Sequence, residues 1–224
     1  MYPVYIDIET IPTSRRDVRD YIAASIKPPG TLKKPESIQA WIDNDKEQAI
    51  DDAVAKTGLD GAFGQIVCVG VDAHDDGQPV VFSGLDERDL LTRFNGFLSD
   101  QIRPSDLMAT TVVGHNVASF DLRFLLQRYI VNSIKPHPLI ARSASAKPWE
   151  SEKVYDTMIQ FSGVGNRISL DKLCLALSIP SPKGEIDGSK VAEYVAAGAL
   201  DQVAEYCGKD VEAVRSVHRR MVFA

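Results

Sequence analysis

The feature that most constrains the fold is an apolar strand near the N-terminus that carries two acids on one face. Residues 2–8 alternate as in a strand, so Asp7 and Glu9 should point the same way. Adjacent carboxylates repel each other, and burying them without a partner is costly. Either the strand ends there and water solvates both acids, or a divalent cation such as Mg²⁺ or Mn²⁺ lies between them. The opposite face of the strand is apolar and consists of Val4, Ile6 and Ile8.

The remaining pattern predicts a mixed sheet with helices on both faces. Residues 65–72 and 79–83 look like strands joined by a hairpin turn at Asp75-Asp76-Gly77. Two further strands, at 108–113 and 154–156, alternate with helices. Ser119 is expected to cap the helix predicted at residues 120–131. The helical patterns cover residues 86–99, 120–131, 169–178, 188–197 and 199–221.

Residues 11–63 differ from the rest of the chain because they are rich in charge and proline. They contain helical patterns at about 15–26 and 36–56, and their apolar residues need something to pack against. We therefore expect a single domain over residues 1–224, within which 11–63 form an insertion, or lid, folded over the domain.

Two further acids lie at positions where burial is expected. Asp121 follows a buried strand and a Gly-His-Asn turn, which places it at the carboxyl edge of the sheet, although an acid in a first helical turn also has a structural explanation. Asp210 falls within the apolar stripe of the last helix, where a carboxylate needs an ionic partner or a metal. That stripe consists of Val203, Cys207, Val211, Val214, Val217 and Met221.

Charge and cysteine content exclude some classes of protein. The net charge of −6 disfavours a protein that coats duplex nucleic acid, but an acidic metal site is compatible with it. The three cysteines form no CxxC pair, so neither a zinc site nor a disulfide framework is indicated. We expect reduced thiols, a cytoplasmic location, and neither a transmembrane helix nor a secretory leader.

The order of the acids resembles the DEDD superfamily of 3′–5′ exonucleases. The motifs are Asp7-Ile8-Glu9-Thr10, then Asn116 to Asp121, then Tyr206 to Asp210. Tyrosine four residues before the last Asp is typical of the tyrosine-type branch, whereas Glu205 occupies the position that the histidine-type branch requires. Further stretches resemble stand-alone bacterial or phage proteins related to the exonuclease domain of family B DNA polymerases, namely VYDTM (154–158), SLDKLCLALSIP (169–180) and DGSKVAEYV (187–195).

This resemblance implies an α/β fold of the ribonuclease H-like class: a mixed five-stranded sheet flanked by helices, with a helical insertion after the first strand. It also implies two Mg²⁺ or Mn²⁺ ions. By resemblance Asp7 contacts both ions, Glu9 and Asp210 complete the site of the first, and Asp121 holds the second through water. Tyr206 would orient the attacking water. The product would be a nucleoside 5′-monophosphate.

The resemblance also suggests the substrate, which would be the 3′ end of DNA, mainly single-stranded. Thr10, Asn116, Phe120 and Arg123 are candidate substrate contacts, with core packing as the alternative for Phe120 and a solvated surface charge for Arg123. No membrane partner is expected, and the sequence identifies no protein partner.

Three other functions remain open from the sequence. The same fold could trim RNA, because the sequence does not reveal whether a 2′-hydroxyl is tolerated. A non-catalytic module that binds nucleic-acid ends would be expected to have lost one of the acids, and none is missing. A haloacid-dehalogenase-type phosphatase would need Asp where Glu9 stands.

Overall fold

The structure is a computed structural model that describes residues 2–74, 77–182 and 186–224. Its centre is a mixed five-stranded sheet in the order β3-β2-β1-β4-β5. The mixed five-stranded sheet was predicted, whereas the order of its strands was not. Strand β1 pairs in parallel with β4, and β4 pairs in parallel with β5, whereas β2 and β3 are antiparallel. The strands are β1 (Tyr2–Ile11), β2 (Gln65–Asp72), β3 (Val80–Ser83), β4 (Thr110–Gly114) and β5 (Val154–Asp156).

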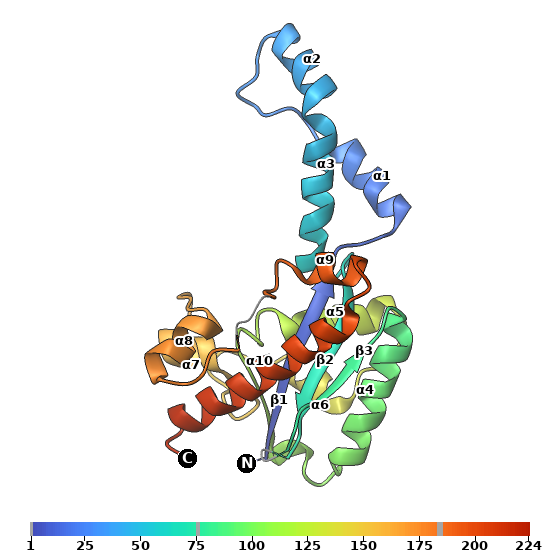
Figure 1. The fold of residues 1–224 in the computed structure, drawn as a ribbon. Coiled ribbons are helices and arrows are strands. Elements are labelled where there is room, and N and C mark those ends of the chain that lie inside the picture. Colours follow the sequence, from blue (N-terminus) through green and yellow to red (C-terminus); the bar gives the residue numbers. More distant parts are fainter. Residues whose placement is uncertain (1, 75–76, 183–185) are drawn as a thin grey trace. The chain divides into compact units, whose positions relative to one another are not determined.

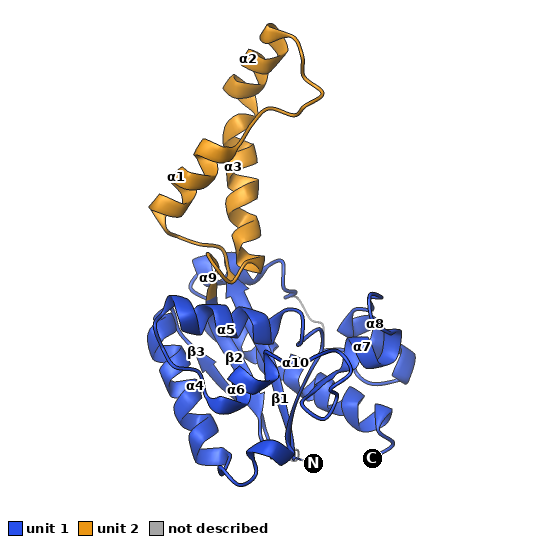
Figure 2. Ribbon diagram, turned by 180° about the vertical axis from the view of Figure 1, so that it is seen from behind, with its two compact units in different colours: residues 1–10, 66–224 blue, residues 11–65 orange. Residues whose placement is uncertain are grey.

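Helices cover both faces of this sheet. The long helix α10 crosses in front of the sheet in Figure 1, and α5 and α6 lie in front in the reverse view of Figure 2. No helix among the described residues is both long and apolar enough to cross a bilayer. The helices of this part are α4 (Glu87–Gln101), η2 (Leu107–Ala109), α5 (Asp121–Val131), α6 (Pro138–Ser143), α7 (Thr157–Ser162), α8 (Leu170–Leu177), α9 (Val191–Ala196) and α10 (Leu200–Met221).

The chain divides into two compact units, coloured separately in Figure 2. Residues 1–10 and 66–224 form the larger unit, and residues 11–65 form the smaller one. That residues 11–63 are an insertion within a single domain stays a prediction. Within the smaller unit Arg19 joins two helices through ion pairs to Glu47 and Asp51. A role as a lid stays a prediction. The helices of the smaller unit are α1 (Arg16–Ser25), α2 (Pro35–Asn44), α3 (Lys46–Ala55) and η1 (Lys56–Leu59).

Side chains of β1 alternate between its two faces, and each face packs in a different hydrophobic cluster. Its apolar face, which includes Ile6, is buried in the main cluster together with residues of α4 and α5 such as Leu90 and Leu125. Its opposite face buries Tyr5 against Val211 and other residues of α10 and β4. Since Asp7 and Glu9 share the face of Tyr5, α10 is the helix that covers the acids.

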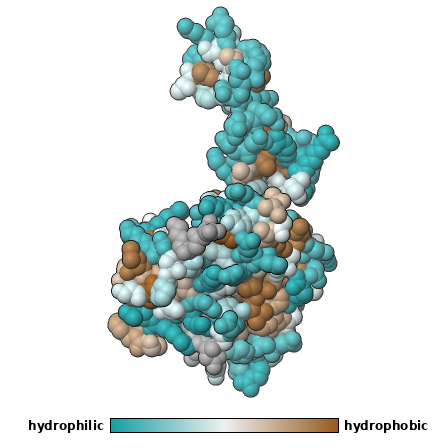
Figure 3. Space-filling view, in the orientation of Figure 1, coloured by the Kyte–Doolittle hydropathy of each residue, from teal (hydrophilic) through white to brown (hydrophobic). Residues whose placement is uncertain are grey.

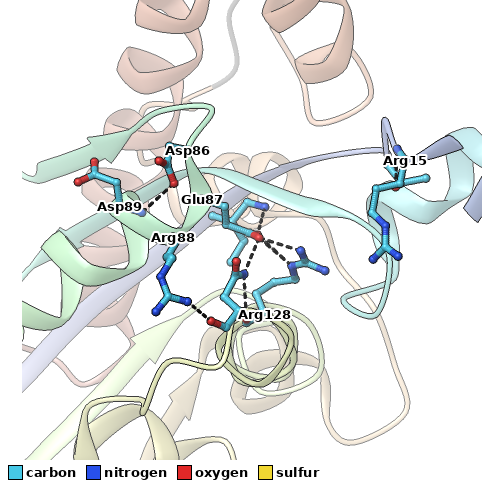
Figure 4. A network of polar contacts seen from close by, with 9 residues as sticks. Arg15, Asp86, Glu87, Arg88, Asp89 and Arg128 are labelled. Atoms are coloured by element: carbon cyan, nitrogen blue, oxygen red, sulfur yellow. Dashed lines mark hydrogen bonds and ion pairs between the residues drawn. The ribbon is translucent and has the colours of Figure 1, made fainter. Parts of the chain in front are cut away.

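A buried ion pair connects α4, α5 and β2 on the other side of the sheet (Figure 4). Glu87 accepts hydrogen bonds from Nη2 of Arg128 at 2.7 Å, from Nδ2 of Asn132 at 2.8 Å and from the backbone N–H of Ile66 at 2.7 Å. A buried carboxylate with this many donors needs no metal. This network shows how the fold balances an acid that has a structural role.

Several predicted boundaries need correction. The helix expected from residue 120 begins at Asp121, and its N-cap is Phe120 without a side-chain cap bond, so the predicted capping role of Ser119 is wrong. The single helical pattern at 36–56 is interrupted at Asp45, whose φ of −116° leaves the helical range, and gives α2 and α3. The pattern at 188–197 is helical only over α9.

The strand boundaries also shift by a few residues. Strand β1 continues past the predicted end at residue 8, and residues 107–109 form the short helix η2 in place of the start of β4. The antiparallel pairing of β2 with β3 is confirmed. In the predicted hairpin turn between them, Asp75 and Asp76 lie outside the described residues.

The close approach of α10 to the sheet depends on Gly70 in the middle of β2. A Cβ atom at this position would lie 2.8 Å from Cγ2 of Val211 and 3.0 Å from Sγ of Cys207. Replacing Gly70 with Ala is therefore expected to lower the free energy of unfolding by about 1–3 kcal/mol, the usual cost of overpacking a core. Urea denaturation followed by circular dichroism would measure it.

Gly96→Ala is the matched control, because a Cβ atom at this exposed position in α4 meets nothing within 4 Å. It should raise the free energy of unfolding by about 0.5–1 kcal/mol through helix propensity. Equal effects of the two substitutions would contradict the proposed role of Gly70.

Candidate functional site

Three carboxylates converge where α10 passes over β1. Asp7 and Glu9 come from β1, and Asp210 comes from α10. One carboxylate oxygen from each residue lies within 4.8 Å of the other two. Glu9 and Asp210 are both only 7% exposed, and Asp7 is partly buried. The structure thus brings together three of the four acids that the sequence singled out.

The surrounding packing explains why these acids meet. The apolar stripe of α10 docks on the Tyr5 face of β1, and Asp210 lies in that stripe. Cys207, one turn before Asp210, places its Sγ 3.6 Å from Oδ2 of Asp7. The helix can come this close because β2 has Gly70 beneath Cys207.

Asp121, the fourth acid, lies beside this cluster without belonging to the group of three. Its Oδ1 accepts a hydrogen bond from the backbone N–H of Ile8 at 3.1 Å, and Ile8 stands between Asp7 and Glu9 in the strand. Its side chain is 4% exposed. Asp121 is therefore held at the same edge of the sheet, at the start of α5, close enough for its charge to act on Asp7.

Asp156, at the end of β5, fixes the turn that leads to Asp121. Its carboxylate accepts hydrogen bonds from the backbone N–H groups of Asn116 and Ala118, at 3.0 and 3.1 Å. It also caps α7 by accepting from Met158 and Ile159, as expected for a cap residue. Its contact with the 114–120 turn was not predicted from the sequence. The structure explains the contact, because the parallel pairing of β4 with β5 puts both strand ends at the same edge of the sheet.

Burial raises the pKa values of all four acids, and the charges of neighbouring acids raise those of Asp7, Glu9 and Asp121 further. Burial is the largest cause for each of them. The pKa values of Asp7 and Glu9 rise well above their usual range, with the charge of Asp210 as the next cause. Burial raises the pKa of Asp121 to about 7, although the hydrogen bond from the backbone of Ile8 lowers it in part. Burial raises the pKa of Asp210 to about 6. The four carboxylates therefore resist being ionised together unless a positive charge joins them.

Tyr206 borders the cluster one turn before Asp210. Its hydroxyl donates a hydrogen bond to the Asp210 carboxylate, which lowers the pKa of that acid. Burial and the neighbouring acids raise the pKa of the Tyr206 hydroxyl well above its ordinary value. The phenol therefore stays protonated near neutral pH and acts as a hydrogen-bond donor.

Two cavities are lined in part by Tyr206. One, of about 180 Å³, is lined by Tyr206 and Asp210 together with residues that include Ser169 and Asp187. The other, of about 200 Å³, is lined by Tyr206 together with residues that include Ile186 and Tyr194. The carboxylate cluster is thus accessible from a concave surface that has both polar and aromatic walls.

The donor set fits a hard divalent cation. Oxygen atoms alone converge here, as Mg²⁺ and Mn²⁺ prefer. Among the described residues no lysine or arginine forms an ion pair with Asp7, Glu9, Asp121 or Asp210, in contrast to the balanced Glu87. The sulfur of Cys207 is outside the group of converging ligand atoms, and burial raises the pKa of its thiol, which stays neutral in the metal-free protein.

The four predicted substrate contacts have different surroundings. Thr10 is partly buried near the end of β1, and Arg123 is exposed. Asn116 adopts a left-handed backbone conformation with φ of 61°. Phe120 packs against the main core and its ring centroid is 5.5 Å from that of Phe124. Contact of these side chains with a substrate stays a prediction.

Two histidines of this unit have structural partners. His115 hydrogen-bonds to Oγ1 of Thr157 at 2.9 Å and to the carbonyl of Ile168 at 2.8 Å, and burial lowers its pKa. His218 is buried with its Nδ1 3.1 Å from the hydroxyl of Tyr5. His218 therefore packs in the interior.

Comparison with known proteins identifies the family. A family model described as a predicted 3′–5′ exonuclease related to the exonuclease domain of PolB matches residues 63–223. No curated protein matches the chain. The matched span includes Asp121, Tyr206 and Asp210, whereas Asp7 and Glu9 precede it and reach the site through the pairing of β1 with β4.

The raised pKa values predict that the metal-free protein loses stability as the pH rises from about 5 to about 8. An unfolded Asp or Glu has a pKa near 4, so in this window the native chain binds more protons than the unfolded chain, and the free energy of unfolding falls. In Asp210→Asn this decrease should be smaller by about 1–3 kcal/mol, because one repelling charge is absent. Urea denaturation in EDTA across this pH range would measure both slopes.

Stabilisation of the protein by Mn²⁺ is a second test of whether these carboxylates share a cation. At pH 8, Mn²⁺ at 100 times its dissociation constant should raise the free energy of unfolding of the unaltered protein by about 2.7 kcal/mol. At the same Mn²⁺ concentration, the increase in the free energy of unfolding should be smaller in Asp210→Asn, because one of the converging carboxylates is absent. Equal pH slopes together with equal gains in the two proteins would show that the carboxylates do not share a cation.

Proposed function

We propose that the chain, which belongs to the family of predicted 3′–5′ exonucleases related to the exonuclease domain of PolB, removes nucleoside 5′-monophosphates from the 3′ ends of DNA. Single-stranded ends are the proposed substrate. The observation that carries this proposal is the convergence of Asp7, Glu9 and Asp210 within 4.8 Å, without a side-chain cation among the described residues to balance them.

The four acids would hold two divalent ions, Mg²⁺ or Mn²⁺. Asp7, Glu9 and Asp210 form the closest oxygen cluster, and Asp121 lies beside it at the start of α5. Bound ions of this kind supply activation of water at neutral pH and neutralisation of charge on a phosphodiester. The carboxylates must be ionised to bind them, so binding at the candidate site weakens as the pH falls.

Tyr206 acts in this proposal as a donor that positions other groups. Its hydroxyl stays protonated because burial and the neighbouring carboxylates raise its pKa, so it cannot accept a proton from water at neutral pH. It instead donates its one O–H to the Asp210 carboxylate, and its oxygen can accept a hydrogen bond from a water in the site. This geometry supports orientation of the attacking water without general-base catalysis by the phenol.

The two cavities beside Tyr206 give the strand end room to bind. The smaller one shares Asp210 with the acid cluster, and the other offers the aromatic ring of Tyr194. Thr10, Asn116, Phe120 and Arg123 complete the proposed substrate contacts, with exposed Arg123 as a phosphate ligand.

Asp210→Asn is expected to reduce hydrolysis of a 5′-labelled oligothymidylate by at least about 1,000-fold, because loss of a metal ligand removes several kcal/mol of transition-state stabilisation. The fold should persist, since Asn keeps the shape of the side chain and an oxygen that can accept from Tyr206. Asp201→Asn, at an exposed acid in the first turn of the same helix, should leave the rate unchanged. Gel analysis with Mg²⁺, Mn²⁺ and EDTA measures the rates.

The same assay decides the substrate. Products that shorten one nucleotide at a time from the 3′ end, on DNA faster than on a matched oligouridylate, support the proposal. Faster degradation of RNA would favour the RNA-trimming alternative. Binding of the oligonucleotide without metal-dependent cleavage would favour a non-catalytic module.

Tyr206→Phe is expected to slow hydrolysis by about 10–100-fold, less than Asp210→Asn, because it removes one hydrogen bond to a charged group. That hydrogen bond lowers the pKa of Asp210, so its loss should shift the acidic limb of the pH–rate profile to higher pH. A rate profile measured between pH 5 and 9 tests both effects. An unchanged acidic limb with full activity would contradict the assigned role.

A further inference from the structure

The smaller unit has a pocket of its own, in a part of the chain that lies almost wholly before the family match. The pocket has a volume of about 420 Å³, within the range of pockets that bind small ligands. The loop before α2 supplies Pro29 and Leu32 as apolar walls, and α2 supplies Ser37, Trp41 and Asn44. Figure 3 shows brown hydrophobic residues among teal hydrophilic ones in the region of α2 and the loop before it.

Trp41 is half-buried, so part of its indole ring remains open to the pocket. Its Nε1–H has no hydrogen-bond partner among the described residues, nor has the side-chain oxygen of Asn44, whose Nδ2 donates to the carbonyl of Ala40. The pocket therefore combines an aromatic surface with an unused donor and an unused acceptor. A nucleobase presents both a flat π-face and hydrogen-bonding edges.

The loop that lines this pocket is basic. Residues 26–35 contain Lys27, Lys33 and Lys34 and no acid, in a chain with a net charge of −6. All three lysines are exposed, and in the part of the chain that the structure describes they form no ion pair. In the same unit Arg19 is neutralised by two acids of α3. The three lysines are thus available to an external anion.

We propose that this pocket is a second nucleic-acid site, at which a base of a single strand stacks on Trp41 while Lys27, Lys33 and Lys34 contact the adjacent phosphates. Aromatic stacking beside exposed cations is the usual combination in proteins that bind single strands without sequence preference. An uncharged peptide would use the apolar walls but would leave the lysines without a function.

Two variants and the intrinsic fluorescence test this proposal in the full-length protein. The chain has two tryptophans, so Trp149→Phe leaves Trp41 as the only one. In EDTA, where metal-dependent hydrolysis is off, a twelve-nucleotide oligothymidylate should quench the fluorescence of this variant. Trp41→Ala should weaken binding, measured by anisotropy of a labelled oligonucleotide, by about tenfold, the usual effect of losing one stacked base.

Lys33→Gln combined with Lys34→Gln keeps the pocket intact, because both side chains are exposed. This double variant should weaken binding and reduce the slope of log affinity against log salt by about 1.4, the value for two lost phosphate contacts on a single strand. Lys56→Gln, at the C-terminal end of α3 and outside the loop, is the control. It should change neither the affinity nor the salt slope.

The proposal fails if the oligonucleotide leaves the fluorescence of Trp41 unchanged and the double variant keeps the salt slope of the unaltered protein. It also fails if Trp41 responds only to protein concentration, because the pocket would then join two copies of the chain. Hydrolysis of a labelled trinucleotide with Mn²⁺ tests the proposed exonuclease activity separately.

Discussion

The repulsion between Asp7, Glu9 and Asp210 is the constraint on which the rest of the structure depends. Two of these acids share a strand face and the third faces them from α10, so the packing of that helix on β1 forces their charges together. Elsewhere the fold balances a buried acid completely, as Glu87 with Arg128, Asn132 and the backbone of Ile66 shows. The contrast between these two sites, and not burial alone, marks the carboxylate cluster as a place for a cation.

Close packing and backbone hydrogen bonds together hold the cluster in position. Gly70 lets α10 approach the sheet, and Asp156 ties the turn after β4 to the end of β5. Neither residue lies in the group of converging carboxylates, yet each determines where one of the acids stands. A site of this kind needs its supporting residues as much as its ligands, because small displacements change electrostatic energies greatly at short range.

Much of this arrangement could be predicted from the sequence. The two-residue period of β1 placed Asp7 and Glu9 on one face, and the helical period of the last segment placed Asp210 in its apolar stripe. The start of α5 could not be predicted, because Asp156, far along the chain, holds the turn before it where Ser119 was expected to act. The contacts of Cys207 with Asp7 and Gly70 join residues far apart in the chain, which local patterns do not reveal.

The position of Asp210 in the last helix has a consequence for how the protein is made. Synthesis proceeds from the N-terminus, so Asp7 and Glu9 are made first and the third carboxylate follows much later, within α10. A chain that stops before α10 would therefore keep two of the three converging carboxylates and would lack both the third and the helix that covers them.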